Sequence, residues 1–210
     1  MATPEKAERH RRSDGERSRT AILRAAADLA TTHGLEGISI GQLADHVGMS
    51  KSGLYAHFGS KEELQLATIE TAQEIFDREV IAPAVAVGGG LARVRELCER
   101  FLSHVERNVF PGGCFFASAA AELDTRPGPV QDRVAGTLAG WTELLLSGLR
   151  EAQANGEVER SVGLDQLVFE LNALLLQANN MWVLQNDTRV LGWARRAIQR
   201  LLDEARPAPD

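Results

Sequence analysis

Cysteine and aromatic residues are scarce in this 210-residue chain, and long apolar runs are missing. The two cysteines, Cys98 and Cys114, are too few for a disulfide framework and form no C-x-x-C pair. Aromatic residues make up only 5% of the sequence. No apolar stretch is long enough to span a bilayer, and the N-terminus has no apolar signal region. We therefore expect a cytoplasmic protein without a membrane partner.

Signals for β-strands and for the common enzyme classes are missing as well. No sustained alternation of β-branched residues occurs, whereas Leu and Ala, both strong helix formers, are abundant. The chain has no G-x-S-x-G, H-E-x-x-H or P-loop motif. The spacing of Cys98, His104 and Cys114 matches no common zinc pattern. We expect an all-α fold with no catalytic residues, no metal site and no cofactor.

Positive charge is not in excess, although its distribution is uneven. The formal net charge of −6 at pH 7 does not favour contact with nucleic acid over the whole surface. Residues 1–61, however, hold nine Lys and Arg against seven Asp and Glu, while the remainder holds 14 against 22. Contacts with phosphate groups are therefore expected in the N-terminal part of the chain.

The most informative stretch runs from Ser39 to Lys61 and predicts two short helices joined by a tight turn. In the first, from Ile40 to Val47, apolar residues recur at i, i+3, i+4 and i+7 and share one face. Ser39 is placed to cap its first turn. Gly48 allows a left-handed conformation at its end with little steric cost.

The second helix is predicted from Lys51 to Phe58, with Ser50 as its N-cap. Leu54 and Phe58 lie four residues apart on one face, which leaves the polar side chains to point elsewhere. Two short helices in this arrangement are typical of a helix-turn-helix, whose second helix enters the major groove of DNA.

The stretch resembles the DNA-binding signature of TetR-type (tetracycline-repressor-like) transcriptional regulators. The resemblance rests on Gly34 and Gly37, the run S-I-x-x-L-A-x-x-V-G, and M-S-K-S-G-L-Y-x-H-F followed by S-K-E-E-L. It covers about residues 17–69, and its many fixed spacings make it specific. It implies an N-terminal helix-turn-helix domain and a C-terminal helical domain that binds ligand and dimerises. Most such proteins repress transcription, bind a palindromic operator in double-stranded DNA and leave it when a small-molecule effector binds.

The resemblance also implies which side chains touch DNA. The family's phosphate-holding positions correspond to Ser39, Tyr55, His57 and Lys61, and the start of the second helix, where base edges are reached, corresponds to Lys51, Ser52 and Gly53. Gly41 departs from relatives that carry a long base-reading side chain, and Gln42 is expected to compensate. Tyr55 and His57 have alternative roles, in packing and in a structural hydrogen bond. The predicted DNA contacts are Ser39, Gln42, Ser50, Lys51, Ser52, Gly53, Tyr55, His57 and Lys61.

Three segments are expected along the chain. Residues 1–14, with R-H-R-R at 9–12, form a flexible basic arm that either touches DNA or stays solvated. Residues 15–62 form the helix-turn-helix domain, which opens with a helix from about Glu16 to His33. Residues 63–205 form the ligand-binding and dimerisation domain. A connector helix over 60–82 begins with a capping box at Ser60 and Glu63 and is expected to stop at Pro83.

The last two predicted helices, over 163–183 and 187–205, are apolar on two sides each. In the TetR-type family the corresponding helices of two subunits pack into a four-helix interface, so the resemblance implies a homodimer. The alternative is that both sides are buried within one chain. The residues predicted at the interface are Leu164, Leu167, Leu171, Leu175, Ala194, Ile198 and Leu201.

The resemblance further implies a small-molecule pocket in the C-terminal domain. Candidates combine aromatic walls with a few polar groups, as ligand pockets do. They are Phe101, His104, Cys114, Phe115, Phe116, Trp141, Asn172, Leu176 and Trp182. For each of them, plain core packing is the alternative. The sequence does not identify the ligand.

Two interpretations of function follow from these patterns. The first is a dimeric, ligand-responsive regulator that binds DNA, and the second is an all-α protein that holds a small apolar ligand without touching DNA. Replacing Lys51 and Tyr55 by Ala distinguishes them, because only the first interpretation predicts that DNA binding is lost. The first also predicts binding that weakens steeply as salt rises.

Overall fold

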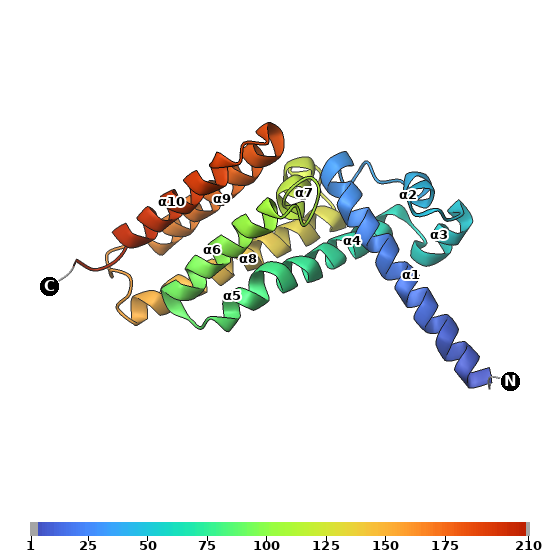
Figure 1. The fold of residues 1–210 in the computed structure, drawn as a ribbon, viewed down its shortest axis with the longest axis horizontal. Helices are drawn as coiled ribbons and strands as arrows, with labels where there is room; N and C mark the ends of the chain where they lie inside the picture. The colour runs from blue at the N-terminus through green and yellow to red at the C-terminus, as the bar shows by residue number, and fades with distance from the viewer. Residues whose placement is uncertain (1–3, 209–210) are drawn as a thin grey trace.

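The computed structural model describes residues 4–208 of the chain, with side chains described over residues 15–208, and this part of the chain is helical without a strand. The helices are α1 (Pro4–His33), α2 (Ile40–Val47), α3 (Lys51–Phe58), α4 (Lys61–Phe76), α5 (Ala82–Ala86), α6 (Gly90–Glu106), α7 (Phe115–Leu123), α8 (Pro129–Ala154), α9 (Leu164–Gln185) and α10 (Arg189–Glu204). A π-helical turn, η1 (Asp77–Ile81), joins α4 to α5. Figure 1 shows α2 and α3 at one end of the molecule and the C-terminus at the other.

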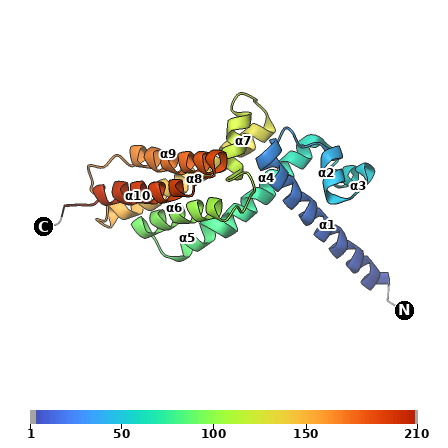
Figure 2. The ribbon, with the colours of Figure 1, turned by 45° about the horizontal axis from the view of Figure 1, so that its top comes forward.

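The helix-turn-helix forms as the sequence predicts, and both of its helices have the predicted bounds. Ser39 and Ser50 are their N-caps, each accepting a backbone hydrogen bond from the residue three positions on. Gly48 takes the left-handed conformation, with φ at 69°. Leu43, Ala44 and Leu54 are fully buried, and α1 packs against both α2 and α4. Figure 2 shows α2 and α3 next to α1 and α4; α2 packs against α1, and α3 contacts α4.

The first helix begins at Pro4 and not near Glu16, so the prediction of where it starts is wrong. Residues 4–14 are rich in Glu, Lys, Ala and Arg, which are strong helix formers. Proline is favoured in the first turn of a helix, where its missing N–H costs nothing. The segment predicted as an arm is thus helical from Pro4 onward. Its side chains lie outside those described, so its contact with DNA stays a prediction.

The connector helix does not stop at Pro83. The chain remains helical from Lys61 to Ala86, and the π-helical turn η1 lies just ahead of the proline. The N–H of Ala82 donates to the carbonyl of Asp77, five residues earlier, whereas an α-helical hydrogen bond spans four residues. Pro83 then stands in the first turn of α5, where a proline is tolerated. The prediction failed because it treated proline only as a terminator.

The C-terminal domain is built around α6, which packs against α5, α8, α9 and α10. The two helices predicted over 163–183 and 187–205 are present as α9 and α10, with ends that differ by up to two residues. Figures 1 and 2 both show α9 and α10 side by side. Within the part of the chain that the structure describes, no helix is long and apolar enough to cross a membrane.

Most of the predicted dimer-interface residues are buried inside the monomer. Leu167, Leu171, Leu175, Ala194 and Ile198 all belong to the core, and Leu164 and Leu201 are half-buried against it. These five residues face the core of their own chain, which the sequence could not reveal because both sides of each helix are apolar. Their contact with a second copy stays a prediction. The exposed apolar side carries Phe169, Leu176 and Leu184 on α9 and Trp193 on α10.

His104 is a fully buried histidine on α6. Its ring lies edge-on to Phe76 and Phe110, with centroid distances of 5.7 and 5.6 Å. Neither ring nitrogen has a hydrogen-bond partner among the described residues. Burial, which disfavours the charged imidazolium, lowers the pKa of His104 to about 4. The neutral ring therefore serves the core as an aromatic side chain near pH 7.

We predict that His104 makes the fold sensitive to acid. Between pH 6.5 and pH 4 the unfolded chain binds a proton at this site that the folded chain does not, so the free energy of unfolding falls as the pH falls. Urea unfolding of the wild type should lose about 3 kcal/mol more over this window than the His104→Leu variant, given a pKa near 4 and ~1.4 kcal/mol per pKa unit. Parallel profiles for wild type and His104→Leu would contradict the prediction.

Candidate DNA interface and internal cavity

The outer face of α3 is polar and open to solvent. Lys51 and Ser52 are exposed, and 55% of Tyr55 is exposed, whereas Leu54 is fully buried. On the inner face the guanidinium of Arg19 lies over the Phe58 ring, 5.3 Å from its centroid. This contact ties α3 to α1. The lysine, the serine hydroxyl and the phenol are therefore free of the core on a helix whose opposite face is fixed.

Ser39 and Gln42 form a reciprocal capping box at the start of α2. The Ser39 hydroxyl accepts a hydrogen bond from the Gln42 N–H at 3.1 Å and donates to the Gln42 side-chain oxygen at 3.1 Å. At the start of α3, the Ser50 hydroxyl accepts from the Gly53 N–H at 3.1 Å. Ser39, Gln42 and Ser50 thus orient the helix N-termini, whose partial positive charge suits phosphate.

Gly41 and Lys51 lie close together across the two helices. A Cβ built on Gly41 would come within 3.3 Å of the Lys51 Cε atom and 3.4 Å of its Nζ atom. The missing side chain at Gly41 therefore leaves room for the Lys51 chain to run along α2. Gly41 thus makes space for a lysine, in addition to lacking the base-reading side chain of some relatives.

The ammonium group of Lys61 is hydrogen-bonded within the protein. It donates to the carbonyl of Glu36 at 2.7 Å and to the carboxylate of Glu36 at 3.1 Å. The Gln65 side chain donates to the same carboxylate at 2.8 Å. The hydrogen bond from Gln65, followed by that from Lys61, holds the pKa of the Glu36 carboxyl below its ordinary value. Among the other predicted contacts, His57 and Gly53 are half-buried.

A cavity of about 220 Å³ lies in the C-terminal domain between α4, α6, α7, α8 and α9. The rings of Phe76 and Trp141 meet edge-on with centroids 5.5 Å apart, and Phe101 lies 6.1 Å from Trp141. The Trp141 N–H donates to the Asn172 side-chain oxygen at 2.8 Å. The lining consists of Phe76, Phe101, Cys114, Phe116, Ala117, Thr137, Leu138, Trp141, Thr142, Asn172, Leu175 and Leu176.

The structure brings together six of the predicted pocket residues, namely Phe101, Cys114, Phe116, Trp141, Asn172 and Leu176. His104, Phe115 and Trp182 do not line the cavity. His104 and Phe115 pack in the core, while the Trp182 N–H donates to the Asn108 side-chain oxygen at 3.4 Å. Sequence reasoning missed the other six lining residues, which are Phe76, Ala117, Thr137, Leu138, Thr142 and Leu175. Thr137 and Leu138 lie four and three residues before Trp141, a spacing that places them on its helix face.

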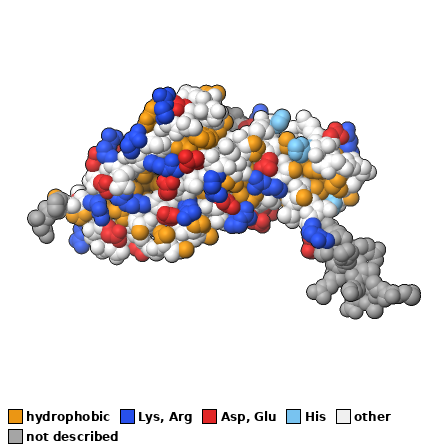
Figure 3. Space-filling model, viewed as in Figure 1, with side chains coloured by type: hydrophobic (Ala, Val, Ile, Leu, Met, Phe, Trp, Pro, Cys, Tyr) orange, Lys and Arg blue, Asp and Glu red, His pale blue; other side chains and the backbone are white. Residues whose placement is uncertain are grey.

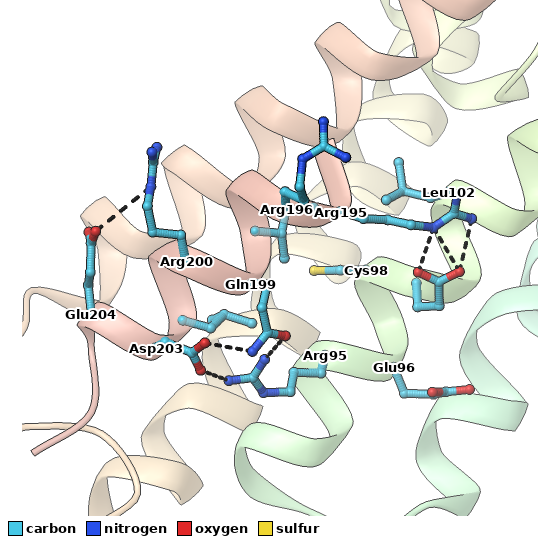
Figure 4. Close-up of a pocket in the computed structure, with 13 residues that line it drawn as sticks. Arg95, Glu96, Cys98, Leu102, Arg195, Arg196, Gln199, Arg200, Asp203 and Glu204 are labelled. Atoms are coloured by element: carbon cyan, nitrogen blue, oxygen red, sulfur yellow. Dashed lines mark hydrogen bonds and ion pairs between the residues drawn. The ribbon is translucent and has the colours of Figure 1, made fainter. Parts of the chain in front are cut away.

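A second and larger hollow, a groove of about 980 Å³, runs between α6 and α10 (Figure 4). Ion pairs bridge it: Arg95 binds Asp203 at 2.6 Å, and Arg195 binds Glu99 at 2.9 Å and Glu106 at 2.7 Å. Hydrogen bonds to Glu99 first and then to Glu106 raise the pKa of Arg195. Figure 3 shows basic and acidic side chains next to one another over these helices. The ion pairs across the groove therefore link α6 to α10, and the lining of the groove has no excess of either charge.

Both cysteines are buried and free. Burial raises the pKa of the Cys98 thiol to about 12 and also raises that of Cys114. Since the thiolate is the reactive form, both groups are poor nucleophiles near neutral pH. Over the described residues, no group of three or more His, Cys, Asp or Glu side chains is arranged to hold a metal ion.

Comparisons with known proteins agree with this geometry. Residues 22–68 match the family model "Bacterial regulatory proteins, tetR family", and residues 90–198 match "Tetracyclin repressor-like, C-terminal domain". The transcriptional regulator AcuR of Cereibacter sphaeroides is 25% identical over 198 residues, which are 93% of this chain and 81% of AcuR. The HTH-type transcriptional repressor AcnR of Corynebacterium jeikeium is 25% identical over 162 residues, 73% of this chain and 75% of AcnR.

Solved structures show the same fold. A TetR transcriptional regulator from Chloroflexus aurantiacus J-10-FL superposes with a TM-score of 0.81 at 24% identity, covering 91% of this chain and 97% of its own. AibR, solved with isovaleryl coenzyme A and operator DNA, superposes with a TM-score of 0.71 at 22% identity, covering 86% of this chain and 95% of the AibR chain. Since the C-terminal match alone spans more than half of the chain, this protein belongs to the TetR family and is a DNA-binding transcriptional regulator, not an enzyme.

Proposed function

We propose that the protein is a homodimeric repressor that binds a palindromic operator and is released by a small uncharged molecule. The observation that carries the proposal is a combination of two features in one chain. The outer face of α3 is polar and exposed while its inner face is buried, and an aromatic cavity lies in the C-terminal domain. The curated relative AcnR is named a repressor, which supports the sign of regulation.

The DNA contacts are proposed from exposure and hydrogen-bonding capacity. Lys51, Ser52 and Tyr55 present donors on the exposed face of α3, where base edges and phosphates are reached. The capping residues Ser39, Gln42 and Ser50 would hold phosphate at the helix N-termini, with Gly53 and His57 beside them. For Lys61 we propose a structural contact with Glu36 in place of phosphate binding, because its ammonium group donates to both the carbonyl and the carboxylate of Glu36.

We propose that a second copy of this chain packs against the exposed apolar side of α9 and α10. Phe169 is 68% exposed, Leu184 85% and Trp193 45%, and large apolar side chains left exposed on two neighbouring helices favour an interface. A groove between α9 and α10 is lined by Phe169, Ala173, Leu174, Ala197 and Leu201 together with charged residues at its edge. Two recognition helices, one from each copy, would then read two half-sites.

The ligand is proposed to be small and uncharged. A cavity of about 220 Å³ is smaller than the usual site for a drug-sized molecule. None of the described residues that line it is charged, so an ionised group placed inside would lose its hydration without a partner. AibR has been solved with isovaleryl coenzyme A. The phosphates of such a ligand would find no cation in this lining.

Selection of bound sequences from a random pool of duplex DNA tests the proposal as a whole. An enriched palindrome supports a dimeric reader, and the spacing of its half-sites reports the distance between recognition helices. The enriched duplex then serves as the probe for the test of Lys51 and Lys61.

The first prediction separates Lys51 from Lys61 by salt dependence. Lys51→Gln should weaken binding to the enriched duplex and lower the slope of log affinity against log salt by about one, as expected for one lost phosphate contact. Lys61→Gln should leave this slope unchanged, because its ammonium group is bound to Glu36. Equal losses of slope in the two variants would show that Lys61 also contacts phosphate.

The second prediction concerns assembly. Phe169→Glu places a charge in the proposed interface and should convert the dimer to a monomer in sedimentation at micromolar concentration. The half-exposed Val85 on α5 lies outside the proposed interface, so Val85→Glu is the matched control and should remain dimeric. A Phe169→Glu protein with the wild-type dimer dissociation constant would place the interface elsewhere.

The third prediction concerns the charge of the ligand. Benzyl alcohol and benzoate have the same ring and similar size, but only benzoate carries a charge at pH 7. Quenching of tryptophan emission should show benzyl alcohol binding at least about tenfold more tightly, since the cavity offers no partner for a buried carboxylate. Isovaleryl coenzyme A should not compete with it. Tighter binding of benzoate or of the acyl thioester would refute an uncharged ligand.

A further inference from the structure

The short turn between α1 and α2, residues 34–37, is held by both domains. The N–H groups of Leu35 and Glu36 donate to the two carboxylate oxygens of Glu122, at 2.6 and 3.0 Å. Glu122 lies on α7, in the C-terminal domain. Hydrogen bonds between backbone N–H groups and an ionised carboxylate are among the stronger ones in proteins. This α1–α2 turn is thus fastened by a single side chain from the domain that encloses the cavity.

The other side of the α1–α2 turn is fastened by α4. The Gln65 side chain donates to the Leu35 carbonyl at 3.1 Å, and Lys61 donates to the Glu36 carbonyl at 2.7 Å. Gly34 has a positive φ of 82°, and a Cβ there would lie 2.6 Å from a Glu122 oxygen. The glycine therefore allows both the bend and the close approach of the carboxylate. Ser39, the cap of α2, follows three residues after Glu36.

The helix that carries Glu122 also forms a wall of the cavity. Cys114, Phe116 and Ala117, at the start of α7, line the cavity, while Glu122 stands near its end. Nine helical residues span only about 14 Å, so α7 is a short rigid link between the two places. The N–H of Cys114 donates to the Asn179 side-chain oxygen at 2.8 Å, which fixes the start of α7 to α9.

We propose that Glu122 is a positioning residue that couples the cavity to the DNA-reading helices. This inference rests on the proposed function and names its regulatory route. A molecule in the cavity that displaces Phe116 or Ala117 moves α7 as a unit, and the Glu122 carboxylate transmits that movement to the α1–α2 turn. Because α4 holds the opposite side of the turn, a shift of α7 relative to α4 changes the orientation of α2 and α3. The coupling is reciprocal, so bound DNA must also alter the cavity.

The test uses this reciprocity and needs no identified ligand. The parent for this test is a Trp182→Phe, Trp193→Phe variant whose dimerisation and binding to the enriched duplex are first verified, because Trp193 belongs to the proposed interface. In this background Trp141 in the cavity wall is the remaining tryptophan of the three. Its emission is measured with and without saturating amounts of the enriched duplex, so that altered DNA affinity does not enter the result. We expect the duplex to shift the emission in this background and Glu122→Ala to reduce the shift at least fivefold.

Two further variants make the outcome specific. Glu122→Gln keeps the size of the side chain and one acceptor oxygen, so the shift should be intermediate; it also decides the test if the alanine variant fails to fold. Glu143→Gln removes an exposed carboxylate from α8, which pairs only with the exposed Arg150 in the described contacts, and should leave the shift unchanged.

The outcomes separate this inference from the function on which it rests. A merely structural role for Glu122 would lower thermal stability and DNA affinity but leave the full Trp141 shift at saturation, and that result would overturn the inference alone. The absence of any shift in the parent background would do the same. A parent protein that enriches no duplex would overturn the proposed function and the inference together.

Discussion

The fold depends on holding two helices of eight residues each in a fixed orientation. Helices this short are unstable alone in water, so their position must come from contacts outside them. Caps at Ser39 and Ser50 each satisfy an N–H group of the first turn. Leu43 and Leu54 are buried as α2 packs against α1, and α3 against α2 and α4. The α1–α2 turn then sets the angle at which the pair leaves α1. The orientation that α2 and α3 present to DNA therefore depends on how this turn is held.

The charged side chains of the C-terminal domain differ in their surroundings from the lysine on the outer face of α3. The C-terminal domain carries the excess of Asp and Glu, yet many of these groups are paired with arginines between helices, as Arg195 is with Glu99 and Glu106. Such pairs contribute little net energy where they are exposed. Their use is to specify which helix faces which. The lysine on the outer face of α3, in contrast, has exposed surroundings and a glycine that accommodates it.

The local signals in the sequence were sufficient for the helix-turn-helix and insufficient elsewhere. A cap and a glycine act within four residues, so the bounds of α2 and α3 could be read from Ser39, Gly48 and Ser50. The inward side of α9 could not be read, because both of its sides are apolar and only the neighbouring helices decide between them. Phe76 was missed as a cavity residue for a related reason. Helical periodicity assigns a residue to a face but does not tell whether that face meets a neighbour or a void.

The π-helical turn at Asp77–Ile81 has a consequence for how this protein relates to its family. A π-turn holds one residue more than an α-turn, and each residue in an α-helix turns the chain by about 100°. Everything after η1 is therefore rotated by that angle relative to a straight continuation of α4. A relative with a regular helix here would align only with a one-residue gap. Deleting one residue from η1 would restore a smooth helix, yet it would turn the fully buried Ala84 away from the core.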